Sequence, residues 1–137
     1  MLAANSYSQE YIDARRAAVA AQIAAYDGLA KAAGDAIDGF ARPFFNNMVV
    51  VLDASFAHRT RGREGKDGNP MNEVRLLAAS ILENDGVLVA DKQIKLRPET
   101  SVLGLEAGDE ISISEADFVR LAEAFFAGIE TTFGPAD

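Results

Sequence analysis

The stretch VVVLDASFAHRT, residues Val49–Thr60, decides which fold the rest of the chain adopts. As a β-strand it would be an apolar run that ends in the carboxylate of Asp53, at the strand end where α/β enzymes place the residues of their sites. As an α-helix it would be largely apolar, with Asp53 and His58 as its polar side chains of interest. An enzyme built on Asp53 and His58 depends on the strand interpretation.

The helical interpretation fits the surrounding residues better. Apolar side chains recur at spacings of three and four from Phe45 to Phe56, whereas only Met48–Leu52 is rich in β-forming residues. A parallel sheet would also need other buried strands that alternate with helices, and the sequence shows no such alternation. We therefore predict a central helix over Pro43–Arg61, because Pro43 suits the first turn of a helix.

Cap residues and apolar periodicity predict the other helices. Ser6 or Ser8 can cap an alanine-rich helix that ends before Gly34, and Asn69 followed by Pro70 is a well-founded helix start. Ser114, with an aspartate three residues later, resembles a capping box. The predicted helices are Ser8–Ala33, Pro43–Arg61, Pro70–Glu83 and Glu115–Phe133, with a short helical turn near Ala36–Phe40. One apolar face is predicted for each of the last two, formed by Met71, Val74, Leu77, Ala78, Ile81 and Leu82, and by Phe118, Leu121, Ala122, Phe125, Ile129 and Phe133.

The segment between the last two helices, Gly86–Ser114, has a different pattern. Valine, isoleucine and leucine alternate there with polar residues, and Gly104 and the AGDE sequence are turn signals. This alternation predicts extended chain with one solvated face. The sequence as a whole therefore predicts one mainly α domain, an antiparallel bundle of about four principal helices with a short β-hairpin segment between the third and the fourth.

The composition excludes several kinds of site and partner. The 137 residues carry a formal net charge of −8 and include no cysteine, so disulfides, thiolate nucleophiles and Cys-type zinc sites are absent. Proteins that bind nucleic acid or anionic membranes are normally basic. We therefore expect neither partner, although a local basic patch is compatible with this charge. A chain without an apolar run of about 20 residues or a secretory signal is expected in the cytoplasm.

Asp53 and His58 are the only candidates for catalysis that the sequence offers. A carboxylate on an apolar helix is costly to bury unpaired, so Asp53 is expected to be exposed, functional or paired with Arg75, Arg120 or an N-terminal arginine. His58 would need an orienting acid from another element to act as a base, and otherwise suits a helix C-terminus. No Glu-x-x-His motif occurs and there is one histidine, so a di-iron site is not expected. An Mg²⁺ or Ca²⁺ site with oxygen ligands from Asp53 and Glu73 is an open alternative without a motif, and no metal or cofactor is predicted.

The loop HRTRGREGKDGNP, His58–Pro70, is the most distinctive functional feature. It carries four basic residues and leads into the predicted helix start at Asn69. Guanidinium groups near free N–H groups at a helix N-terminus favour an anion. The predicted anion-binding residues are Arg59, Arg61, Arg63, Lys66 and Asn69. The same loop also fits a solvated connection whose charges offset nearby acids, and its glycine spacing matches no nucleotide-binding motif.

Two functions follow from these features. The first is a non-catalytic helical domain that self-associates, as a homodimer, and binds a partner or ligand, because no nucleophile pair, metal motif or cofactor loop is present. The alternative is a protein that binds a small anion or phosphorylated ligand, with or without catalysis, through loop 59–69 together with Asp53 and His58.

Overall fold

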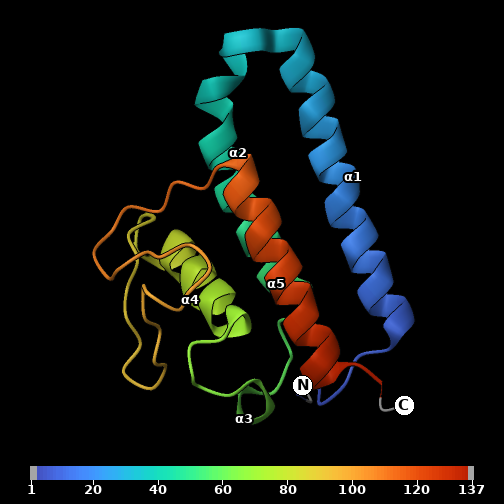
Figure 1. The fold of residues 1–137 in the computed structure, drawn as a ribbon, viewed down its shortest axis with the longest axis vertical. Coiled ribbons are helices and arrows are strands. Elements are labelled where there is room, and N and C mark those ends of the chain that lie inside the picture. Colours follow the sequence, from blue (N-terminus) through green and yellow to red (C-terminus); the bar gives the residue numbers. More distant parts are fainter. Residues whose placement is uncertain (1–2, 136–137) are drawn as a thin grey trace.

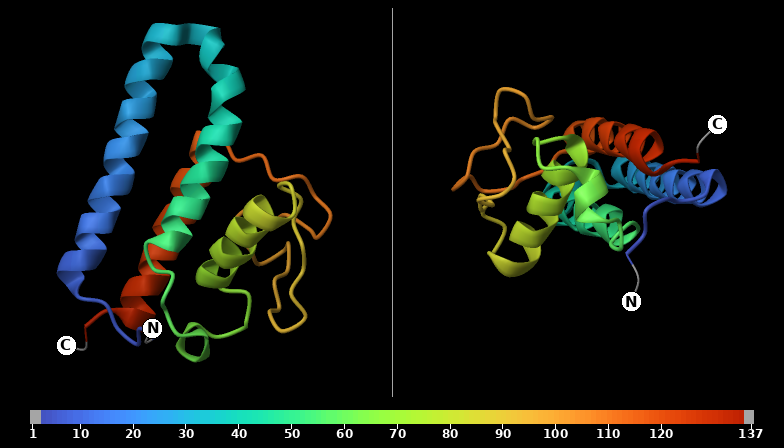
Figure 2. Two further views of the ribbon diagram at one scale, coloured as in Figure 1. Left: turned by 180° about the vertical axis from the view of Figure 1, so that it is seen from behind. Right: turned by 90° about the horizontal axis from the view of Figure 1, so that it is seen from below.

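The computed structural model describes residues 3–135, and these are mainly helical (Figure 1). The elements are α1 (Gln9–Ala33), the 3₁₀ turn η1 (Gly34–Ile37), α2 (Asp38–Ala54), α3 (Arg61–Glu64), α4 (Pro70–Glu83) and α5 (Glu115–Phe133). Helices α1 and α2 run antiparallel and are joined at η1, and α5 lies along the half of this hairpin distant from η1 (Figures 1 and 2). Helix α4 packs against α2 and α5. No helix within these residues is long and apolar enough to cross a lipid bilayer.

The deciding stretch is helical as far as Ala54, so the preference for helix over strand is confirmed. Its apolar periodicity places Phe45, Met48, Val49 and Leu52 in the core. The strand on which an enzyme built on Asp53 depended is therefore not present.

Both predicted ends of this helix are wrong. Helix α2 begins at Asp38, and Pro43 is inside it rather than in its first turn. Proline lacks an N–H and leaves the carbonyl of Gly39 without its helical partner, but both residues are exposed to solvent. The helix ends at Ala54 and not at Arg61. Beyond it the backbone forms tighter turns, in which the N–H of Phe56 donates to Asp53 at 3.1 Å and the N–H of Ala57 to Ala54 at 3.3 Å.

The predicted caps are confirmed at three helices. Ser8 accepts a hydrogen bond from the N–H of Tyr11, and Ser114 accepts one from Asp117. The Asn69 side chain accepts from Met71 and Asn72 at the start of α4. These side chains satisfy N–H groups that the first turn of a helix otherwise leaves free.

The apolar faces of α4 and α5 form the core as predicted, with two differences. All six predicted positions of α5 are buried, and Phe126 is buried as well, 2% exposed, against Phe56 with their ring centroids 6.0 Å apart. The adjacent Phe125 and Phe126 thus both pack within this chain. Leu82 was predicted in the core of α4 but is 68% exposed, since it lies in the last turn beyond the packed face.

The predicted β-hairpin is wrong, since residues 86–114 contain no strand. Only a single antiparallel bridge, Val87 to Glu110, connects the two ends of this segment. The N–H of Leu88 donates to Asp109 at 2.9 Å and the N–H of Ile111 to Gly86 at 2.7 Å. Turns interrupt the chain between these contacts, so no ladder extends from the bridge.

Helix side chains replace the missing ladder. The Glu73 carboxylate accepts from the N–H groups of Val102 at 2.8 Å and Leu103 at 3.0 Å. The Asn46 amide donates to the carbonyl of Ile111 at 2.9 Å and accepts from the N–H of Ile113 at 3.1 Å. Because backbone N–H and C=O groups must be paired when they are buried, these side chains hold the segment in an extended path along α2 and α4 without strand partners.

Candidate functional site

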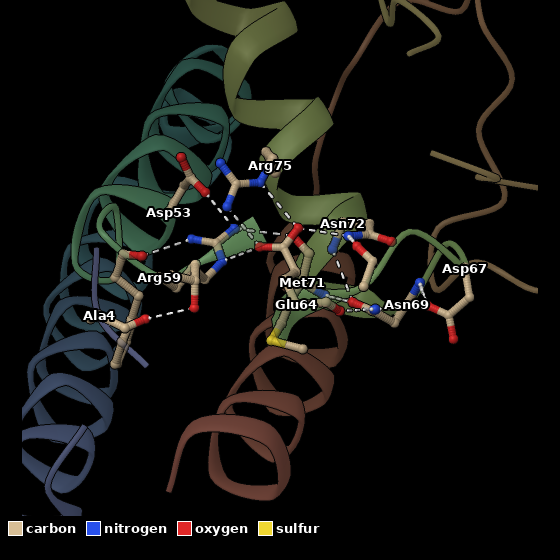
Figure 3. Close-up of polar contacts among 12 residues, drawn as sticks. Ala4, Asp53, Arg59, Glu64, Asp67, Asn69, Met71, Asn72 and Arg75 are labelled. Atoms are coloured by element: carbon tan, nitrogen blue, oxygen red, sulfur yellow. Dashed lines mark hydrogen bonds and ion pairs between the residues drawn. The ribbon is translucent and has the colours of Figure 1, made fainter. Parts of the chain in front are cut away.

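The Arg59 side chain lies at the centre of a buried polar network between α2, α3 and α4 (Figure 3). Its Nε donates to Glu64 Oε1 at 2.5 Å, and its Nη2 donates to Asp53 Oδ1 at 2.8 Å and to the carbonyl of Met71 at 3.1 Å. The side chain is fully buried, and its guanidinium carbon lies 5.4 Å from the centre of the Phe125 ring. All of its charge is therefore directed at groups of this chain.

Glu64 is the main counter-ion of this network. Besides the bond from Arg59, its carboxylate accepts from Arg75 Nη2 at 2.8 Å, from Arg75 Nε at 3.0 Å and from Asn72 Nδ2 at 2.6 Å. Burial alone would raise the pKa of Glu64, but the hydrogen bond from Arg75 and the charges of both arginines outweigh burial and hold this pKa below its ordinary value. Glu64 is therefore ionised at neutral pH.

Two asparagines connect the network to the basic loop. Asn72 is fully buried, accepts from the N–H of Gly68 at 3.0 Å and donates to the carbonyl of Gly65 at 3.0 Å. Asn69 Nδ2 donates to the carbonyl of Glu64 at 2.8 Å while its Oδ1 caps α4. Because both asparagines bind backbone groups of residues 64–68, they fix the path of this loop.

The two candidate catalytic residues are not brought together. Asp53 is paired with Arg59 rather than with any of the arginines proposed for it from the sequence. The His58 side chain is exposed, and among residues 3–135 it makes no hydrogen bond to another side chain, while its main-chain carbonyl accepts from the N–H of Ala4 at 2.6 Å. His58 also lies beyond the end of α2 and does not cap it. Among residues 3–135, no hydrogen bond or ion pair joins these two side chains.

The five predicted anion-binding residues divide into two groups. Arg59 and Asn69 face the protein and hold the loop in place. Arg61, Arg63 and Lys66 are exposed, and within residues 3–135 none of the three forms an ion pair. Arg63 makes one long hydrogen bond, at 3.3 Å, to the carbonyl of Asn5. The exposed group alone is available to a ligand.

Sequence reasoning missed Glu64 and Asn72 as parts of this network, and it proposed Arg75 as a partner of Asp53 rather than of Glu64. One signal for Glu64 was present, since it is the single carboxylate within the basic run RTRGREGK. No comparable signal marked Asn72, which looks like an ordinary polar residue in the first turn of a helix. The contacts that bury these residues come from residues up to 11 positions away, with the Arg75 to Glu64 bond the longest in sequence.

The outward face of α1 is the second feature that suggests binding. Between positions 17 and 29 its exposed residues are all uncharged, and Leu29 is 52% exposed. They are Ala17, Ala18, Ala20, Ala21, Gln22, Ala24, Ala25, Gly28 and Leu29. Gly28 has no atom within 4 Å of the position of a Cβ, so packing inside this chain does not require a glycine there. An exposed helix face without charged residues is a candidate interaction surface.

Comparisons with protein-family models, with curated protein sequences and with solved structures give no match for this chain. Among residues 3–135, no three Asp, Glu or His side chains are grouped so that they could hold a metal ion.

Proposed function

We propose that the protein is a non-catalytic binding module that self-associates as a homodimer through the outward face of α1. The observation that supports this proposal is the uncharged exposed surface between Ala17 and Leu29. A glycine inside a helix costs about 1 kcal/mol relative to alanine. No neighbouring atom within this chain requires a glycine at position 28. Close approach of a second helix would explain why a glycine is present there.

The charges at the two ends of this face favour an antiparallel pair of α1 helices. Asp13 and Lys31 are exposed, on either side of the uncharged region. Their separation of 18 residues corresponds to about five turns, so both side chains lie on the same side of the helix. In an antiparallel pair whose midpoint lies at the level of residue 22 along the helix axis, Asp13 of one copy is at the same level as Lys31 of the other. Opposite charges at such positions favour one orientation over the other.

Sedimentation velocity over a range of concentrations tests this proposal. The wild-type chain should pass from monomer to dimer as its concentration rises, and Ala21→Glu, at the centre of the face, should remain a monomer. Ala116→Glu adds the same charge at an exposed position in the first turn of α5 and should dimerise like the wild type. A monomer at all concentrations in the wild type, or equal loss in both variants, contradicts the proposal.

A second candidate function is binding of a small anion or phosphorylated ligand by the exposed residues Arg61, Arg63 and Lys66. The rigid mounting of their loop on the buried network supports it, because preorganised groups lose less entropy when they bind. Arg59 and Asn69 would serve this site by holding the loop. A thermal-shift screen against phosphates, nucleotides and sugar phosphates tests it, since a ligand at about 100 times its Kd adds about 2.7 kcal/mol of stability. The shift should disappear in Arg61→Ala/Arg63→Ala.

The two functions are compatible, because α1 and the loop are separate surfaces (Figures 1 and 2). For either function we place the protein in the cytoplasm, since a chain without cysteine suits a reducing compartment.

A further inference from the structure

Two loops that are far apart in the sequence run side by side next to α3 (Figure 1). The N–H of Lys95 donates to the carbonyl of Lys66 at 2.9 Å. Gly68 has a φ of +85°, and a Cβ there would lie 2.3 Å from the carbonyl oxygen of Lys95, so the two backbones are in direct contact. Segments 61–68 and 91–98 therefore form one continuous surface.

Alternation along the second segment directs its basic residues outward. Ile94 and Leu96 are partly buried and pack against the core, whereas Lys95 and Arg97 between and after them are exposed. Lys92 is exposed as well. The polar alternation that resembled a strand in the sequence thus separates an apolar side, which attaches the segment, from a basic side, which faces solvent.

The combined surface concentrates positive charge in an acidic chain. It carries six exposed basic residues out of the 13 in the whole sequence, whose formal net charge is −8. We call these six the basic face: Arg61, Arg63, Lys66, Lys92, Lys95 and Arg97. Glu64 does not neutralise them, because Arg59 and Arg75 already pair with it.

Two further carboxylates lie on these segments, and both accept backbone hydrogen bonds. Asp67 accepts from the N–H of Asn69 at 3.3 Å, and Asp91 accepts from the N–H of Gln93 at 2.7 Å. Six positive side chains therefore remain against two negative ones, and the face stays strongly positive.

We propose that the basic face binds a ligand that presents several phosphate groups in a row, the chemistry shared by inorganic polyphosphate and the phosphodiester chain of nucleic acid. The crevice between the two segments, lined in part by Arg61, Lys66 and Gln93, has a volume of only about 10 Å³, which holds about one water molecule. A ligand has to lie across the surface rather than inside it, and a row of phosphates can reach charges on both segments.

Recognition at this face depends on charge and not on bases. Segments 61–68 and 91–98 contain no aromatic residue on which a base could stack. Affinity should therefore be independent of nucleotide sequence and fall steeply with salt, by about a thousandfold between about 50 and 200 mM if all six side chains contact phosphate. This inference rests on the second candidate function: it keeps the loop site, adds the 92–97 segment to it and names the ligand class.

Fluorescence anisotropy with three labelled probes tests the inference: inorganic polyphosphate, a DNA duplex and poly-glutamate. Charge reversal in Lys66→Glu/Lys95→Glu should weaken binding of the phosphate probes at least about tenfold at low salt. The control variant Arg42→Glu/Arg120→Glu changes the net charge equally, at exposed positions outside the basic face, although it also removes two surface ion pairs, with Glu110 and Asp117. It should bind like the wild type. Tighter binding of polyphosphate or of DNA then identifies the source of the phosphates.

Three results would overturn the inference. If poly-glutamate binds as tightly as the phosphate probes, the face selects negative charge in general and the phosphate assignment fails. If Lys95→Glu/Arg97→Glu leaves polyphosphate affinity unchanged while Arg61→Ala/Arg63→Ala abolishes it, the loop site stands and the two-segment face fails. If no probe binds at about 50 mM salt and no anion shifts the melting temperature, both the face and the second candidate function fail.

Discussion

Replacement of Glu64 by glutamine is expected to remove a large part of the stability of this fold. The carboxylate accepts four hydrogen bonds and its side chain is 1% exposed. Glutamine has the same shape but is neutral and presents an NH₂ group to guanidiniums that can only donate. The fully buried Arg59 would keep Asp53 as its single counter-ion. Breaking a buried ion pair on one side costs about 3–5 kcal/mol, out of a total of about 5–15 kcal/mol for a typical domain.

Urea denaturation, followed by circular dichroism, measures this loss. With an m-value of about 2 kcal/mol/M, a loss of about 4 kcal/mol lowers the midpoint by about 2 M. Glu123→Gln, at an exposed position of α5, is the matched control and should change the midpoint little. A loss below about 1 kcal/mol in Glu64→Gln, the value typical of solvent-exposed pairs, would refute the argument that the network is dry and tightly coupled.

The pH dependence of stability gives a second measure of the same group. Its pKa is lower in the folded chain than its ordinary value, because the hydrogen bond from Arg75 and the charges of both arginines outweigh burial. The unfolded chain therefore binds the proton more readily, and the stabilisation is complete above the ordinary pKa of glutamate. It should be lost as the pH falls through the lower, folded pKa. Glu64→Gln should show a smaller loss of stability over this acidic window than the wild type.

The remaining predictions concern backbone contacts and a carboxylate pair. Gly68→Ala should destabilise the fold, because Gly68 has a φ of +85° and a Cβ there would lie 2.3 Å from the Lys95 carbonyl oxygen. In the control Gly62→Ala the new Cβ meets no atom within 4 Å, so this variant should be neutral or stabilising. Thermal denaturation of the two variants distinguishes these outcomes. Asp27→Asn should raise the melting temperature at neutral pH. The pKa of Glu115 is raised by a hydrogen bond to Asp27, by burial and by the charge of Asp27. The contribution of this wild-type pair to stability is therefore largest below the ordinary pKa of glutamate. It is lost as the pH rises through the higher pKa of the folded chain. The difference between this variant and the wild type should therefore vanish near about pH 4; a difference that persists there contradicts repulsion as its cause.

Local signals in the sequence were sufficient to predict the helices. The caps at Ser8, Asn69 and Ser114 depend on residues within three positions of each other, and the structure confirms all three. The helix over Val49–Ala54 likewise follows from spacings of three and four among its apolar residues. Such patterns are readable because the physical cause and its effect lie within one or two turns of the same helix.

Long-range polar contacts were not predictable in this way. Nothing near Arg59 in the sequence shows that it is fully buried rather than exposed like Arg61, because its partners come from three different elements. The same applies to the segment after α4. Its alternation correctly indicated an apolar and a polar side, but whether a strand forms depends on what takes its N–H groups, and Glu73 and Asn46 take several of them.

The buried network around Arg59 also bears on function. A well-packed apolar cluster of similar volume can be as stable as a buried ion network, so stability alone does not account for four charged residues and two asparagines at this position. Polar groups, unlike apolar ones, fix direction: Asn72 and Asn69 bind particular backbone groups of the loop. The loop is thereby held beside Lys95, with Lys66 and Arg61 facing solvent. On this argument the network serves to place the basic face, and damage to the network should reduce phosphate binding even in variants that remain folded.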